Sequence, residues 1–146
     1  MSSDRFNPYF AVYLVFRNKD QILLLQRFKT GFEDGNYSMV SGHVDAGEDF
    51  ITAAIREGSE EAGVQIAESD LNLAYIQHYS RPDRAYVNAF FNVEKYAGEI
   101  LNAEPNKCSD LSWFEINNLP ENTIPYIKVA ISDMLLGKNT GVWGWN

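Results

Sequence analysis

Hydrophobic positions along this chain of 146 residues follow two different periods. Runs rich in β-branched and aromatic residues predict strands at residues 9–16, 21–27, 37–40, 71–79, 85–93 and 111–114. A polar turn cluster at 17–20 indicates that the first two runs form a hairpin.

Two other segments have the period of an amphipathic helix. Residues 49–62 place apolar or small residues at i, i+4, i+7 and i+11, and they end before Gly63. Residues 124–136 show a similar stripe and end before Gly137. Strands and helices interleave without a repeat, so we expect an α/β fold, a sandwich with a mixed β-sheet between helices. The whole chain, 1–146, has the length of one domain.

Composition narrows the classes of partner. The chain is 45% hydrophobic, and 12 Lys and Arg against 20 Asp and Glu give a net charge of −8. This balance argues against binding a nucleic-acid polymer or an anionic membrane. An anionic small molecule would need local positive charge or a metal ion. The single cysteine, Cys108, excludes an internal disulfide, and no apolar run approaches a membrane span, so we expect a cytoplasmic protein.

The densest group of candidate catalytic residues lies in residues 42–64. On a helix, Glu60 lies roughly 60° to one side of Glu57 and Glu61 roughly 40° to the other. Like charges at this spacing destabilise a helix by about 0.2–0.5 kcal/mol per pair. A stripe of this kind is ordinarily a solvated helix face. A bound divalent cation is the alternative that would offset the repulsion.

The spacing of the same segment resembles the signature of the Nudix hydrolases, G-x5-E-x7-R-E-U-x-E-E-x-G-U, where U is a bulky aliphatic residue. The matching residues are Gly42, Glu48, Arg56, Glu57, Glu60, Glu61, Gly63 and Val64. Gly58 departs from the pattern, because it stands where the family usually has an aliphatic residue. Residues 23–27, 30–37 and 104–114 extend the resemblance to a bacterial branch of the family. Asn88 stands where this branch often carries an acid, which we expect to alter what is recognised.

The resemblance implies a Nudix-type α/β/α sandwich and a pyrophosphohydrolase. It implies attack by water on phosphorus in a nucleoside diphosphate linked to another moiety X, such as a nucleoside triphosphate or modified nucleotide. The implied cofactor is Mg²⁺, with Mn²⁺ as an alternative. The implied partner is thus a small nucleotide, and a homodimer is compatible with the family.

Residue roles follow from the same resemblance. Glu57 and Glu61 are the principal metal ligands that it implies, together with the backbone carbonyl of Ser41. Glu60 is a further ligand or helps to activate the water. Arg56 and Glu48 are expected to support these ligands by an ion pair.

Residues outside the signature are more open. Glu104 is a candidate additional acid in the site. Arg27 ends an apolar run and either reaches a phosphate or is a surface charge at the end of a hairpin. Arg81, Arg84 and Lys107 are interpreted as solvent charges. Aromatic residues that could stack on a base are Phe32, Tyr37, Tyr79 and Phe90.

Two other functions remain compatible with this sequence. A catalytically silent Nudix domain could serve as a nucleotide-binding sensor or interaction module, although such a module need not keep its carboxylates. A plain α/β domain with an acidic helix would show no effect of Mg²⁺ on its melting temperature. The identity of the base, sugar or X group is not fixed by any spacing rule.

Overall fold

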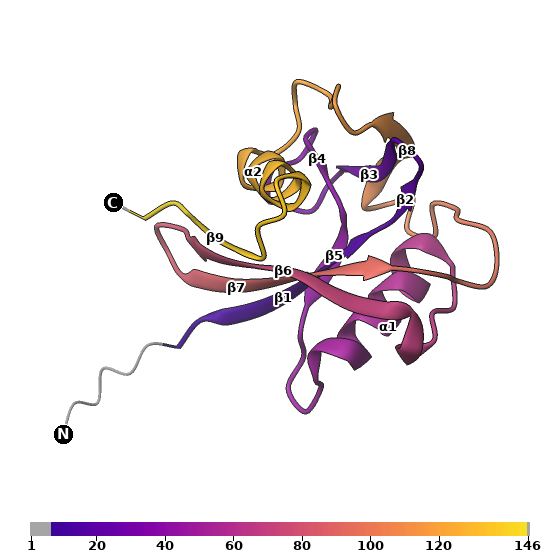
Figure 1. Ribbon diagram of the computed structural model, residues 1–146, viewed down its shortest axis with the longest axis horizontal. Helices are drawn as coiled ribbons and strands as arrows, with labels where there is room; N and C mark the ends of the chain where they lie inside the picture. The colour runs from indigo at the N-terminus through magenta and orange to yellow at the C-terminus, as the bar shows by residue number, and fades with distance from the viewer. Residues whose placement is uncertain (1–6, 146) are drawn as a thin grey trace.

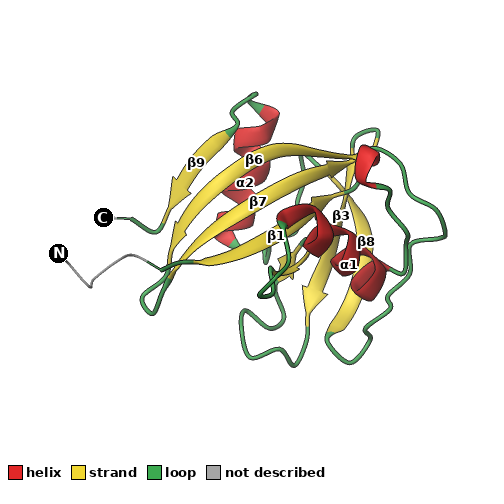
Figure 2. Cartoon of the chain, turned by 90° about the horizontal axis from the view of Figure 1, so that it is seen from below, coloured by secondary structure: helices red, strands yellow, loops and turns green. Residues whose placement is uncertain are grey.

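A mixed five-stranded sheet forms the centre of the computed structural model, which describes residues 7–145 (Figures 1 and 2). In spatial order its strands are β5 (Val40–His43), β1 (Tyr9–Val15), β7 (Ala85–Val93), β6 (Leu71–Ser80) and β9 (Thr140–Trp143). The β1–β7 and β6–β9 pairs are parallel, whereas the β1–β5 and β6–β7 pairs are antiparallel. The sheet is therefore mixed, as predicted.

A second, smaller sheet packs beside the first. It contains β2 (Arg17–Asn18), β3 (Gln21–Arg27), β4 (Tyr37–Ser38) and β8 (Cys108–Glu115), with β3 paired to each of the others. The helices are α1 (Phe50–Ala62) and α2 (Pro125–Leu135), with a short 3₁₀ turn, η1, at Glu68–Asp70. Strand β8 is longer than the predicted segment 111–114.

The alternating side chains of β1 separate two hydrophobic cores. Val12 and Leu14 pack with α1, whereas Ala11 and Tyr13 pack with α2. Because neighbouring residues of a strand point to opposite faces, the two helices cover opposite faces of the central sheet. The predicted α/β/α sandwich is thereby confirmed.

The predicted hairpin of 9–16 with 21–27 forms only at its turn. The two residues of β2 pair with β3, but β1 itself pairs with β5 and β7 in the other sheet. The reason lies in the continuous burial of residues 11–16. A strand that is buried on both faces belongs at the centre of a covered sheet and not in a hairpin with one solvated face.

The C-terminal strand β9 was not predicted from the sequence. It has only four residues and pairs in parallel with β6 at the edge of the sheet. Gly141 lets it lie close to the hydrogen-bonded Tyr75 hydroxyl and Asp133 carboxylate, since a Cβ there would lie 2.0 Å from the Tyr75 oxygen. Helix α2 ends one residue before the predicted end, and Leu135 is 44% exposed.

Helix α1 begins and ends with specific caps. The Asp49 carboxylate accepts a 2.7 Å hydrogen bond from the Thr52 amide, so Asp49 caps the helix rather than lying in its first turn. Gly63 ends the helix in the left-handed conformation, with φ of 69°. Glu57 lies on the buried side of α1 and not on a solvated face, because its side chain faces the loop at Gly42.

The glycine that departs from the signature is explained by close packing. A Cβ on Gly58 would lie 2.8 Å from Ile66 Cδ1 and 3.3 Å from Leu14 Cδ1. These two side chains fill the space that an aliphatic residue would otherwise occupy. Gly58 therefore allows α1 to approach β1 and residue 66 closely.

This packing predicts different effects for two substitutions. Gly58→Leu should destabilise the fold by about 1–3 kcal/mol, because the added side chain overpacks the core. Gly58→Ala should change stability by less than about 1 kcal/mol, because a gain in helix propensity offsets a small shift of Ile66. Urea denaturation would measure both. A Leu variant as stable as the parent would contradict this account of Gly58.

Candidate active site

One cleft, with a volume of about 470 Å³, contains most of the residues expected to act in catalysis. Its acidic side chains are Glu57, Glu60, Glu61 and Glu104, and its basic side chains are Arg27, Lys29, Arg81 and Lys107. Its aromatic wall consists of Tyr13, Phe32, Tyr79, Tyr86 and Tyr126. Ser41 and Gly42 of β5 lie between these groups. The cleft is large enough for a nucleotide-sized ligand.

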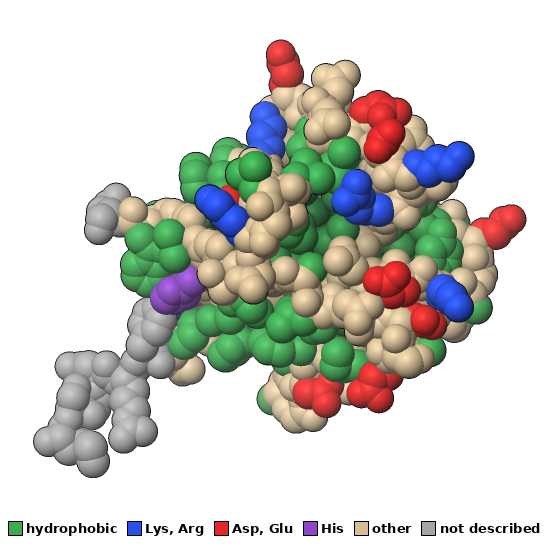
Figure 3. All heavy atoms as spheres, viewed as in Figure 1, with side chains coloured by type: hydrophobic (Ala, Val, Ile, Leu, Met, Phe, Trp, Pro, Cys, Tyr) green, Lys and Arg blue, Asp and Glu red, His purple; other side chains and the backbone are tan. Residues whose placement is uncertain are grey.

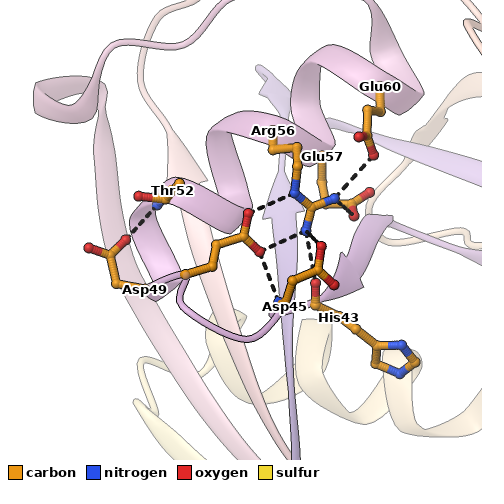
Figure 4. Close-up of polar contacts among 8 residues, drawn as sticks. His43, Asp45, Asp49, Thr52, Arg56, Glu57 and Glu60 are labelled. Carbon is orange, nitrogen blue, oxygen red and sulfur yellow. Dashed lines mark hydrogen bonds and ion pairs between the residues drawn. The ribbon is translucent and has the colours of Figure 1, made fainter.

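Arg56 connects the loop after β5 to helix α1 (Figure 4). Its guanidinium donates to both Glu48 oxygens at 2.8 Å and to the His43 carbonyl at 3.0 Å. It also contacts Glu57 Oε1 at 2.7 Å and Glu60 Oε2 at 3.1 Å. The bidentate Glu48 contact fixes the orientation of the guanidinium. It also lowers the pKa of Glu48 to about 2.

The Glu57 carboxylate occupies space left by Gly42. A Cβ at residue 42 would lie 2.1 Å from Glu57 Oε1, so no larger residue fits without moving this carboxylate. The Glu57 side chain is almost fully buried, with the residue 8% exposed. Burial raises the pKa of Glu57 to about 7 although Arg56 opposes the shift, and Glu60 and Glu104 add to it.

Glu61 lies one helical turn after Glu57 and is half-buried. Its Oε1 accepts a 2.7 Å hydrogen bond from the Ser41 amide. Burial raises the pKa of Glu61 to about 8, which this hydrogen bond partly opposes, and the nearby charges of Glu57 and Glu104 raise it further. The two glutamates thus repel each other in a site with little solvent, and a cation between them would relieve that repulsion.

The donor atoms of this group suit Mg²⁺ or Mn²⁺, since both prefer carboxylate oxygens. Within residues 7–145, however, no three acidic, histidine or cysteine side chains are gathered as a complete metal site. The contacts give the reason, because Arg56 binds Glu57 and Glu60 while the Ser41 amide binds Glu61. The residues fit a divalent cation by chemistry, provided that the carboxylates turn from these partners.

Arg27 is held at the opposite side of the cleft by the loop that follows β3. Its Nε donates to the Phe32 carbonyl at 2.6 Å and its Nη2 to Thr30 Oγ1 at 2.9 Å. Asp34 fixes the same loop by accepting hydrogen bonds from the amides of Thr30 and Gly31. Arg27 is therefore oriented toward the cleft rather than being a mobile charge at the end of a hairpin.

The sequence interpretation missed several residues of the cleft. Arg81 and Lys107, expected to be solvent charges, line it, and the Arg81 guanidinium lies 4.3 Å from the centre of the Phe32 ring. Of the four aromatic candidates, Phe32 and Tyr79 line the cleft, but Tyr37 and Phe90 do not. Tyr86 could have been noticed, because it is a large aromatic residue near the start of a predicted strand.

The remaining predicted residues have clear positions. Ser41, Glu57, Glu60, Glu61, Glu104 and Arg27 all line the same cleft, whereas Glu48 and Arg56 lie behind it. Arg84 is not part of the cleft and lies over the Tyr9 ring at 3.6 Å. On the face seen in Figure 3, Lys and Arg side chains are separated from one another and do not form one basic patch.

Comparison with known proteins gives curated relatives of two kinds. An NAD-capped RNA hydrolase, NudC, from Pseudomonas aeruginosa is 35% identical over 116 residues, which cover 80% of this chain but only 38% of the relative. An ADP-ribose pyrophosphatase from Methanocaldococcus jannaschii is 28% identical over 137 residues, covering 91% of this chain and 76% of the relative. The chain thus spans about two fifths of the length of the NudC relative.

Solved structures agree on the fold. A MutT NUDIX hydrolase from Burkholderia pseudomallei superposes with a TM-score of 0.79 at 23% identity, covering 86% of this chain and 97% of that one. In the part of the chain that the structure describes, no helix is both long and apolar enough to span a membrane. The family model for the NUDIX domain matches residues 5–133. The predicted resemblance is therefore confirmed, and the chain belongs to the NUDIX domain family of hydrolases.

Proposed function

We propose that this chain is a pyrophosphohydrolase that uses Mg²⁺ or Mn²⁺ to cleave a nucleoside diphosphate linked to another moiety X. The observation that supports it most strongly is the convergence of Glu57, Glu60 and Glu61 with Arg27 in one cleft. Family membership supports hydrolysis of nucleoside diphosphate derivatives in general. The metal and the individual residue roles are proposed from the resemblance of the signature, together with the contacts of these residues in the cleft.

In this proposal Glu57 and Glu61 hold the cation, with the Ser41 carbonyl as a backbone ligand. A bound divalent cation lowers the pKa of water and neutralises phosphoryl oxygens. Glu60 is exposed and is held by a single 3.1 Å contact to Arg56, so its carboxylate is free to accept a proton from the attacking water or to join the ligand set. Glu104 adds a further carboxylate to the same side of the cleft.

The basic side chains would bind the diphosphate. Arg27 is fixed to its loop through Nε and Nη2, and a guanidinium has further N–H donors for phosphate oxygens. Arg56 does not line the cleft and acts in this proposal by orienting Glu57 and Glu60. Glu48 in turn holds Arg56 in place.

The relatives widen the set of substrates to be tested. One is named for NAD-capped RNA and another for ADP-ribose. The expectation that no nucleic-acid polymer binds, drawn from the net charge of −8, therefore lacks support. We propose small nucleotides as substrates. NAD-capped RNA is included in the substrate panel described next.

The first prediction concerns turnover. Phosphate, pyrophosphate and nucleotide release from nucleoside triphosphates, ADP-ribose, NAD and NAD-capped RNA should occur with at least one substrate and should require Mg²⁺ or Mn²⁺. Glu61→Gln should lower kcat by about 100-fold or more, because an amide is a poor ligand for these cations. Glu115→Gln, at the exposed end of β8, is the matched control and should equal the parent.

Two results would contradict the proposal. One is a Glu61→Gln variant as active as the parent. The other is the absence of turnover with every substrate; tight nucleotide binding by calorimetry in that case would favour the silent, nucleotide-binding module.

The second prediction concerns the space beside Glu57. Gly42→Ala should lower kcat/KM by about 10- to 100-fold, because the new methyl group displaces a carboxylate that is proposed to bind metal. The melting temperature should change little. Gly58→Ala, the same substitution elsewhere in the signature, is the control and should keep full activity. Unchanged kinetics for Gly42→Ala would show that the position of the Glu57 carboxylate does not matter.

The third prediction concerns pH and metal. Because the folded-state pKa values of Glu57 and Glu61 are raised, the metal-free protein should lose stability as pH rises from about 4.5 toward about 8. Metal binding requires the deprotonated carboxylates, so Mg²⁺ should raise the melting temperature more at pH 8.5 than at pH 6. Thermal melts with and without Mg²⁺ would measure this, and an equal shift at both pH values would refute it.

A further inference from the structure

Two buried amides lie behind the aromatic wall of the cleft. Gln77 on β6 and Asn88 on β7 are direct cross-strand neighbours, and both residues are 0% exposed. Their side chains lie on the face of the central sheet that α2 covers, because Tyr86 and Phe90, two residues to either side of Asn88, belong to that core. This core is otherwise almost entirely apolar or aromatic.

The Asn88 carboxamide has no hydrogen-bond partner among the residues that the structure describes. Both its Oδ1 and its Nδ2 are buried and unpaired, and Gln77 Oε1 is unpaired beside them. Gln77 Nε2, in contrast, donates to the Tyr126 carbonyl at 3.0 Å. A buried amide that lacks both partners destabilises a fold, and such a group calls for a ligand or an internal water to satisfy it.

The position of Asn88 favours a ligand from the cleft. On β1, Ala11 lies opposite Asn88. On β7, Tyr86 is the preceding residue on the same face of the sheet, and both Ala11 and Tyr86 line the cleft. Tyr79 and Tyr126, which also line it, stack on each other with ring centroids 4.3 Å apart. The carboxamide thus lies directly behind a lining of flat rings and one small side chain.

These rings suit a flat, polar ligand. Aromatic faces stack on planar groups, and a carboxamide presents a donor and an acceptor side by side. The edge of a nucleobase offers the complementary pair of groups, as in the bidentate contact of Asn with adenine. An alkyl group would leave both atoms of the carboxamide unsatisfied.

We propose that Asn88 is a specificity-determining residue of the proposed hydrolase, whose carboxamide hydrogen-bonds to the edge of a nucleobase bound against the aromatic wall of the cleft. This inference rests on the proposed function. The ligand reaches Asn88 when one surrounding ring turns aside. Tyr86 is one such ring, because its hydroxyl makes only long contacts, at 3.3 Å to His43 and 3.4 Å to Arg81.

The test combines one substitution with deletions on the base. Kinetics would be measured for the best substrate of the nucleotide panel and for analogues in which hydrogen replaces each exocyclic group of the base in turn. With the parent, one deletion should lower kcat/KM by about 10- to 100-fold. Asn88→Ala should lower kcat/KM for the intact substrate by a similar factor, mainly by raising KM. For this variant, the analogue that is poor with the parent should have the same kcat/KM as the intact substrate.

Asn92→Ala is the matched control, because Asn92 lies in the same strand but outside the cleft. It should behave as the parent with every substrate. Asn88→Ala should not lower the melting temperature, since it removes two unpaired atoms. Residual turnover of the intact substrate by Asn88→Ala would show that the variant is folded.

Several outcomes would overturn the inference. One is an Asn88→Ala variant that weakens intact and deleted substrates equally. Another is unchanged kcat/KM with a lower melting temperature, which would assign Asn88 to an internal water. A parent that hydrolyses every substrate but ignores all base deletions overturns the inference and leaves the proposed function intact, whereas a parent without any turnover overturns both.

Discussion

The ion pairs of Arg56 are the interaction on which the candidate site depends. One guanidinium joins Glu48, the His43 carbonyl, Glu57 and Glu60, which come from the loop after β5 and from α1 (Figure 4). This arrangement fixes the first residues of the loop relative to the helix. It also balances part of the negative charge that burial makes costly. The same contacts keep the carboxylates of Glu57 and Glu60 turned toward Arg56.

Burial supplies the second constraint. Glu57 and Glu61 lie where water is scarce, and this raises the pKa of each carboxyl toward neutrality. A fold stabilises such groups poorly by itself, and the proposed cation would offset their cost. Gly42 and Gly58 serve this arrangement in different ways, since the first leaves space for a carboxylate and the second lets the helix approach the sheet.

Much of the candidate site follows from local sequence. The carboxylates, Arg56 and Gly63 lie within one helix and its preceding loop, so helical geometry and fixed spacing were sufficient to place them. Helix α2 and the strands β6 and β7 were predicted within about two residues for the same reason. Their hydrophobic periods are long and regular.

What the sequence did not reveal depends on tertiary packing. β1 and β3 lie in different sheets because β1 pairs with β7, which the local sequence does not show. Strand β9 is too short to have a recognisable hydrophobic period. Arg81 and Tyr86 join the cleft only in the folded sheet, in which β1 lies between β5 and β7. The unpaired amide of Asn88 also becomes visible only when its neighbours across the sheet are known.

The central claim is that Glu57 and Glu61 bind a divalent cation. A measurement of metal binding tests it most directly. Electron paramagnetic resonance would follow free Mn²⁺ during titration of the metal-free protein at pH 8. The account predicts saturable binding by the parent, and binding weaker by at least about 10-fold when Glu57 and Glu61 are both replaced by Gln. Equal binding by the two proteins, or no binding by the parent, would contradict it.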